Sequence, residues 1–176
     1  MLLANIRRPL LWLLIVATVL GANWSIAKFG FVSVGFGISA PAGVYFAGIA
    51  FTLRDLLHNH PGSSRPWIIS AIVAGALLSA FLEDAQRLAL ASGAAFFLSV
   101  LADWAVYSPL RRRGWIRAVA ASNCVGLIVD SILFLSLAFG SLNYIEGQIL
   151  GKIYMTALAI GVLWVIRSAR QTQMSS

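Results

Sequence analysis

Five ionisable side chains interrupt the apolar stretches of this 176-residue chain: Arg54, Asp55, Asp103, Asp130 and Lys152. Each ionised group near the middle of a membrane-spanning helix costs about 2.5–3.5 kcal/mol to insert. Such groups persist where they face the interior of a helix bundle, pair with one another or contact a polar ligand. We therefore expect these five residues to line a solute pathway, with structural ion pairs, or a place at the level of the lipid headgroups, as the alternative.

Other polar and aromatic residues share helix faces with the ionisable ones. Residues spaced three or four apart lie on one face of a helix. Four such stripes are Tyr45, Gly48, Thr52 and Asp55; Ser92, Phe96, Ser99, Asp103 and Tyr107; Asn123, Gly126 and Asp130; and Gln148, Lys152 and Thr156. Small residues on one face also allow helices to pack closely in any membrane bundle. Four stripes that each contain an ionisable residue favour a polar pathway.

The positions of these residues along their helices predict two polar clusters at different depths. We expect an outer cluster of Asp130, Lys152 and Gln148, and an inner cluster of Arg54, Asp55 and Asp103. A solute would lie between the two clusters, near Asn123, Ser99 and the aromatic rings.

The segments that must position these residues predict an integral membrane protein. Hydrophobic residues make up 60% of the chain and charged residues 11%, against about 45–50% and 25% in soluble domains. A spanning helix needs about 20 mostly apolar residues. We expect an all-α fold with six transmembrane helices in one domain, 1–176, at about 9–28, 41–57, 66–82, 88–109, 115–139 and 148–166. Gly30, Gly35, Gly37 and Pro41 predict an irregular, re-entrant segment at 29–40.

The basic residues predict the orientation in a bacterial inner membrane. With the N-terminus in the cytoplasm, nine of them lie on the cytoplasmic side: Arg7, Arg8, Arg65, Arg111, Arg112, Arg113, Arg117, Arg167 and Arg170. Only Lys28 and Arg87 lie on the other side. Because positive residues concentrate in cytoplasmic loops, both termini should be cytoplasmic. The net charge of +7 is then a topology signal beside anionic lipid, and nucleic acid is not an expected partner.

Catalytic and metal-binding motifs are not expected. Cys124 lies alone in an apolar run, and His58 and His60 have no third ligand nearby in the sequence. No phosphate-binding loop of the G-x-x-x-x-G-K-[ST] kind is present, so the chain should not hydrolyse ATP. We expect no enzyme activity, because no nucleophile lies beside a base, and no cofactor or metal.

Three segments resemble the queuosine precursor transporter, or vitamin uptake transporter (VUT), family of small bacterial membrane proteins: 34–58, 102–140 and 147–155. The most specific features are an aspartate followed by a basic run and a tryptophan, a serine-containing span with an Asp-Ser pair, and a lysine in the last helix. They correspond to Asp103, Arg111, Arg112, Arg113, Trp115, Ser122, Asp130, Ser131, Ala138, Phe139 and Lys152.

The resemblance implies a six-helix inner-membrane importer of 7-deazaguanine precursors of queuosine, such as preQ0 or preQ1. A deazaguanine has N–H donors, a lactam oxygen and a flat face. Asp103, Asp130 and Asn123 would bond its polar edges, and Trp104, Tyr107 or Tyr45 would stack on its face. Which aspartate binds the substrate, which pairs with Lys152 and whether one carries a coupling proton stay open.

The main alternative is a vitamin-binding subunit of an energy-coupling-factor importer, which needs a separate ATPase module. Ala17, Gly21 and Ser25, spaced four apart on the first helix, would suit docking to such a module. A membrane partner or assembly factor that transports nothing is a further alternative.

Overall fold

Six α-helices and one β-hairpin form the part of the chain that the structure, a computed structural model, describes: residues 2–58, 65–81 and 86–174. The elements are α1 (Leu2–Phe29), β1 (Phe31–Gly35), β2 (Ile38–Pro41), α2 (Val44–His58), α3 (Arg65–Ser79), α4 (Gln86–Leu110), the 3₁₀ helix η1 (Arg111–Arg113), α5 (Trp115–Phe139) and α6 (Ile145–Met174). Each expected span therefore contains a helix. The last residue of the span expected at 66–82, and His60, lie outside the described residues.

Three of the described helices are long and apolar enough to cross a membrane: Arg8–Phe29, Gln86–Arg113 and Arg117–Phe139. The helices α2 and α3 have 15 residues each. At 1.5 Å per residue they are about 22 Å long, which is less than the ~30 Å of a hydrocarbon core. The fold is thus largely helical and suited to a membrane, and the number of six spans stays a prediction.

The segment before α2 departs from the irregular, re-entrant conformation expected at 29–40, because within the otherwise helical fold it forms an antiparallel β-hairpin. Val32 pairs with Ala40 and Ser33 with Ser39. The chain turns through Gly35, Phe36 and Gly37, whose φ angles are 104°, 53° and 74°. Glycine adopts positive φ at little cost, so the glycines that exclude a helix here instead supply the turn of a hairpin.

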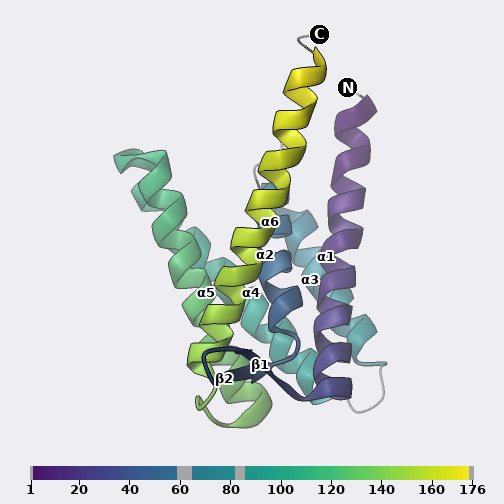
Figure 1. The fold of residues 1–176 in the computed structure, drawn as a ribbon, viewed down its shortest axis with the longest axis vertical. Coiled ribbons are helices and arrows are strands. Elements are labelled where there is room, and N and C mark those ends of the chain that lie inside the picture. The colour runs from purple at the N-terminus through teal and green to yellow at the C-terminus, as the bar shows by residue number, and fades with distance from the viewer. Residues whose placement is uncertain (1, 59–64, 82–85, 175–176) are drawn as a thin grey trace.

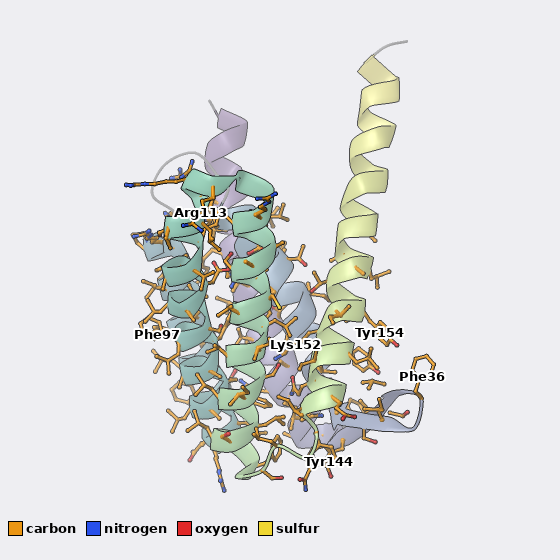
Figure 2. All side chains as sticks on the ribbon, turned by 90° about the vertical axis from the view of Figure 1, so that its left-hand side faces the viewer. Phe36, Phe97, Arg113, Tyr144, Lys152 and Tyr154 are labelled. Carbon is orange, nitrogen blue, oxygen red and sulfur yellow. The ribbon has the colours of Figure 1, made fainter. Side chains whose placement is uncertain are left out.

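Both chain termini lie at one end of the bundle, and the hairpin lies at the opposite end (Figure 1). Arg113 lies at the end of the bundle where α1 begins, and Tyr144 lies at the opposite end (Figure 2). Toward the end with the termini, α5 diverges from α6 (Figure 1). This arrangement groups the basic run of η1 with both termini, and a cytoplasmic location of this end stays a prediction.

A close approach between α2 and α6 sets the position of Lys152. A Cβ atom added at Gly48 of α2 would lie 2.6 Å from the Cβ of Met155 and 2.9 Å from the carbonyl oxygen of Lys152. Real Cβ atoms do not come so close, so the two helix backbones can meet at this distance only beside glycine.

Replacing this glycine, Gly48→Ala, is expected to force α2 and α6 apart and to lower the stability of the fold. Overpacking of this kind costs about 1–3 kcal/mol, which corresponds to a fall of several degrees in Tm. Gly161→Ala on α6 is the control, since a Cβ there meets nothing within 4 Å. The measurement is thermal unfolding of the purified protein in detergent. An unchanged Tm for Gly48→Ala would contradict the expected clash.

Candidate polar site in the bundle interior

A buried ion pair joins α5 to α6. Lys152 Nζ donates hydrogen bonds to Asp130 Oδ2 at 2.6 Å and to Ser131 Oγ at 2.7 Å. The side chain of Lys152 is 1% exposed. The Ser131 hydroxyl donates its own proton to the Leu127 carbonyl, so its oxygen is free to accept from the ammonium group. Two of the ammonium's three protons are therefore satisfied by consecutive residues of one helix.

A second polar network joins α2 to α4 and α5, and it contains the expected inner cluster. Arg54 donates to Asp55 Oδ1 through Nε at 2.9 Å and through Nη2 at 2.6 Å. Asn123 bridges the pair, because its Oδ1 accepts from Arg54 Nη2 and its Nδ2 donates to Asp55 Oδ2, both at 2.9 Å. Asp103 Oδ1 lies 3.8 Å from Arg54 Nη2. Asn123 thus belongs to the inner cluster, and the expectation that it lies between the clusters is wrong.

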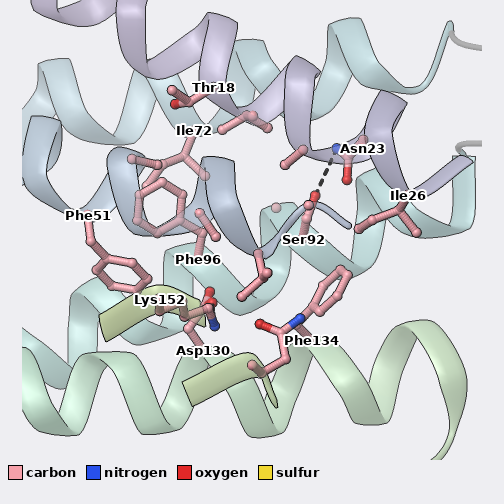
Figure 3. A pocket seen from close by; sticks show the side chains of 18 residues that line it. Thr18, Asn23, Ile26, Phe51, Ile72, Ser92, Phe96, Asp130, Phe134 and Lys152 are labelled. Carbon is pink, nitrogen blue, oxygen red and sulfur yellow. Dashed lines mark hydrogen bonds and ion pairs between the residues drawn. The ribbon is translucent and has the colours of Figure 1, made fainter. Parts of the chain in front are cut away.

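A cavity opens between the six helices α1 to α6, next to the Asp130–Lys152 pair (Figure 3). Its volume is about 50 Å³. By the same measure, one water molecule needs about 10–15 Å³. We call it the outer cavity. Its polar lining is Thr18, Asn23, Ser92, Asp130, Gln148 and Lys152, and its aromatic lining is Phe51, Phe96 and Phe134. All three residues of the expected outer cluster line this cavity, but it extends toward α1 instead of lying between the two clusters.

A smaller cavity of about 30 Å³, here called the inner cavity, lies beside the inner cluster. Asp55, Asp103, Asn123 and Tyr107 are among its lining residues. The Phe51 ring is close to both clusters, with the Arg54 guanidinium 4.9 Å and the Lys152 ammonium 5.9 Å from its centroid.

Only one of the aromatic residues expected to stack on a ligand lines a described cavity, and that residue is Tyr107. Trp104 lies with its ring centroid 6.4 Å from that of His58 and 4.8 Å from the Arg65 guanidinium. The Tyr45 hydroxyl donates to the Ser33 carbonyl in the hairpin. Neither Trp104 nor Tyr45 is therefore placed to contact a solute in either cavity. Phe51, Phe96 and Phe134 occupy that position instead.

Two buried polar residues of the outer cavity, both on α1, are missing from the sequence-based site: Thr18 and Asn23. Asn23 is the less expected of the two, because it carries an amide. The side chain of Asn23 is fully buried, and its Nδ2 donates to Ser92 Oγ at 3.0 Å. The available signal is a single asparagine within the apolar helix Arg8–Phe29. An amide there is costly to bury without partners, but nothing else on α1 indicates which helix it faces.

The arrangement can hold a small, partly polar solute, because ionised and amide groups share a cavity with aromatic rings. Within the described ranges, no group of three or more His, Cys, Asp or Glu side chains is placed to hold a metal ion.

Comparison with known proteins identifies the family. A family model described as "Putative vitamin uptake transporter" matches residues 32–167, which is more than half of the 176-residue chain. No curated protein and no solved structure matches the chain. The matched region contains the hairpin except for Phe31, both polar clusters and the basic run of η1. The chain therefore belongs to the vitamin uptake transporter family.

Proposed function

We propose that this chain imports a 7-deazaguanine precursor of queuosine, such as preQ0 or preQ1, or a closely related small solute, across the bacterial inner membrane. Its membership of a transporter family supports import of a small molecule. The observation that favours a polar heterocycle is the buried Asp130–Lys152 pair with Gln148 at a cavity whose other walls include three phenylalanine rings.

The groups at the outer cavity fit the chemistry of such a base. A carboxylate and an amide can accept hydrogen bonds from ring N–H groups and from an exocyclic amine. An ammonium or amide N–H can donate to a lactam oxygen. Phe51, Phe96 and Phe134 supply apolar surfaces for the flat face of the ring. Energy to bury the solute would come from the rings, and selectivity from the polar groups.

The two polar clusters suit a pathway that opens to one side of the membrane at a time. Phe51 contacts Phe96, with ring centroids 5.3 Å apart, and lies near both clusters. A solute that passes from the outer to the inner cavity would have to displace this aromatic pair. In this proposal the inner cluster, with Asp103, receives the solute before its release to the cytoplasm.

Queuosine in tRNA tests the proposal. The host is a bacterium that cannot make preQ0 and has lost its own importer, supplied with nanomolar preQ0 or preQ1. We expect the intact chain to restore queuosine and both an empty vector and Asp103→Asn to fail. Glu146→Gln, which neutralises an exposed acid at the start of α6, is the control and should restore queuosine like the intact chain. No restoration by a chain confirmed in the membrane would contradict the proposal.

The second candidate is a vitamin-binding subunit of an energy-coupling-factor importer. The small residues that would favour docking do not share one free face: Gly21 lies against the Phe46 ring, Ser25 is buried, and only Ala17 is exposed. This geometry weakens the argument for α1 as a docking helix. Restored queuosine in a host without any such module would exclude this candidate.

A further inference from the structure

Two buried amide oxygens in the outer cavity have no hydrogen-bond partner among the described residues. They are Asn23 Oδ1 on α1 and Gln148 Oε1 on α6. Asn23 is 0% exposed and Gln148 is 2% exposed. A buried acceptor without a donor is unfavourable and uncommon in native proteins. Two of them at one cavity indicate that a ligand supplies the donors.

The hydrogen bonds of Ser92 determine how the Asn23 amide is oriented. The Ser92 hydroxyl donates its single proton to the Ala89 carbonyl at 3.2 Å. Its oxygen can therefore only accept from Asn23, which it does from Nδ2 at 3.0 Å (Figure 3). In this arrangement the NH₂ group of Asn23 faces Ser92, and the carbonyl oxygen is left for the cavity.

The other polar groups make the cavity richer in acceptors than in donors. The Thr18 hydroxyl donates to the Ile15 carbonyl of its own helix at 2.7 Å, so it is not available to a ligand as a donor. Asp130 adds a carboxylate, one oxygen of which accepts from Lys152. The Lys152 ammonium has three protons and uses two for Asp130 and Ser131, so one remains for an acceptor on a ligand.

We propose that Asn23 and Gln148 accept hydrogen bonds from the adjacent ring N–H and exocyclic amine of a fused 2-amino-4-oxopyrimidine, with Lys152 donating to its 4-oxo group. This inference rests on the proposed function and names the part of the substrate that the site selects. Deazaguanines, guanine and pterins all have this edge, so the second ring must distinguish between them. Because a missing ligand donor would leave a buried acceptor unpaired, such a site rejects analogues that lack the amine.

Competition in the intact protein tests the inference without any substitution. Cells that express the chain take up labelled preQ1 in the presence of unlabelled 7-deazaguanine, 7-deazahypoxanthine, which lacks the 2-amino group, or pterin. We expect 7-deazahypoxanthine to compete at least about ten-fold more weakly than 7-deazaguanine. If pterin competes as well as 7-deazaguanine, the shared edge is sufficient for recognition. If pterin competes weakly, the second ring is also selected. Both results agree with the inference provided that the amine is required. Equal competition by 7-deazahypoxanthine would overturn the inference.

Two variants assign the discrimination to these amides. Of Asn23→Leu and Gln148→Leu, the variant that removes the acceptor of the amine should lower the preference for 7-deazaguanine over 7-deazahypoxanthine about ten-fold, toward equality. The other variant removes the acceptor of the ring N–H, which both bases have, so it should raise the concentration that each base needs to compete by about the same factor. Asn143→Leu makes the same substitution at an exposed amide between α5 and α6, and its preference should match that of the intact chain. A folded Asn23→Leu with an unchanged preference and unchanged competition by both bases would overturn the role of Asn23. Uptake of labelled preQ1 without discrimination would refute only this inference, whereas no uptake at all by the intact chain would refute the proposed function and the inference with it.

Discussion

Neutralising either member of the Asp130–Lys152 pair should abolish transport. In Asp130→Asn the ammonium of Lys152, which is 1% exposed, loses its counter-ion, and in Lys152→Met the carboxylate does. Breaking a buried pair from one side costs about 3–5 kcal/mol, because an uncompensated charge stays in a medium that solvates it poorly. Each single variant also removes a group that borders the outer cavity. The measurement is queuosine in tRNA together with the amount of folded protein in the membrane.

The double variant Asp130→Asn with Lys152→Met separates binding from stability. It removes both charges at once, so no unpaired ion remains, and replacement of a whole pair is often close to neutral for folding. We expect the double variant to accumulate like the intact chain and still to transport nothing. Glu146→Gln and Lys28→Met change one acid and one base at exposed positions, and both should leave transport unchanged. Full activity of the double variant would mean that the pair is only structural.

Replacing Arg54 should cause a large loss of stability. Its side chain is 2% exposed and serves Asp55, Asn123 and, at 3.8 Å, Asp103. Arg54→Met would leave the buried Asp103 and the partly exposed Asp55 without a cation, which costs about 3–5 kcal/mol. For a chain of this length that corresponds to a fall in Tm of about 10 °C or more. The measurement is thermal unfolding of the purified protein in detergent.

A conservative replacement at the same position tests whether geometry or charge matters. Arg54 reaches Asp55 through two N–H groups and Asn123 through one of these nitrogens. Lysine restores the charge but not this fork of donors, so Arg54→Lys should recover only part of the stability. Arg113→Met, at an exposed arginine of η1, is the control. A Tm for Arg54→Met within a degree of the intact chain would refute the structural role of the inner cluster.

Helices are the part of this fold that sequence predicts well, because long apolar runs in lipid have few other ways to satisfy their backbone. Each expected span contains a helix, and the glycines before α2 rule out a helix there. The hairpin itself was not predicted. Its pairing depends on Val32 meeting Ala40 across a turn with positive φ, and glycine spacing alone does not distinguish that turn from an irregular segment.

Aromatic residues show where sequence reasoning about the site fails. Trp104 follows Asp103 directly, so the two side chains point about 100° apart around the helix and do not enter the same cavity. Trp104 packs near His58 and Arg65, whereas Asp103 lines the inner cavity. Phe51 and Phe134 were overlooked because phenylalanine is common in apolar spans, and only packing distinguishes a cavity wall from a lipid-facing surface.

The sequence by itself determined that the chain is a membrane protein, which residues are ionisable within its helices, and that Asp130, Lys152 and Gln148 lie on inward-facing stripes. These properties depend on composition and on the 3.6-residue period of a helix, which are local. Only the tertiary structure decided that Asn123 joins Arg54 and Asp55, that the cavity opens toward α1, and that Asn23 and Gln148 face the same space. Those relations join residues far apart in the chain. They depend on how each helix is rotated and on close approaches between helices such as that at Gly48, and the periodicity of a single helix does not reveal either.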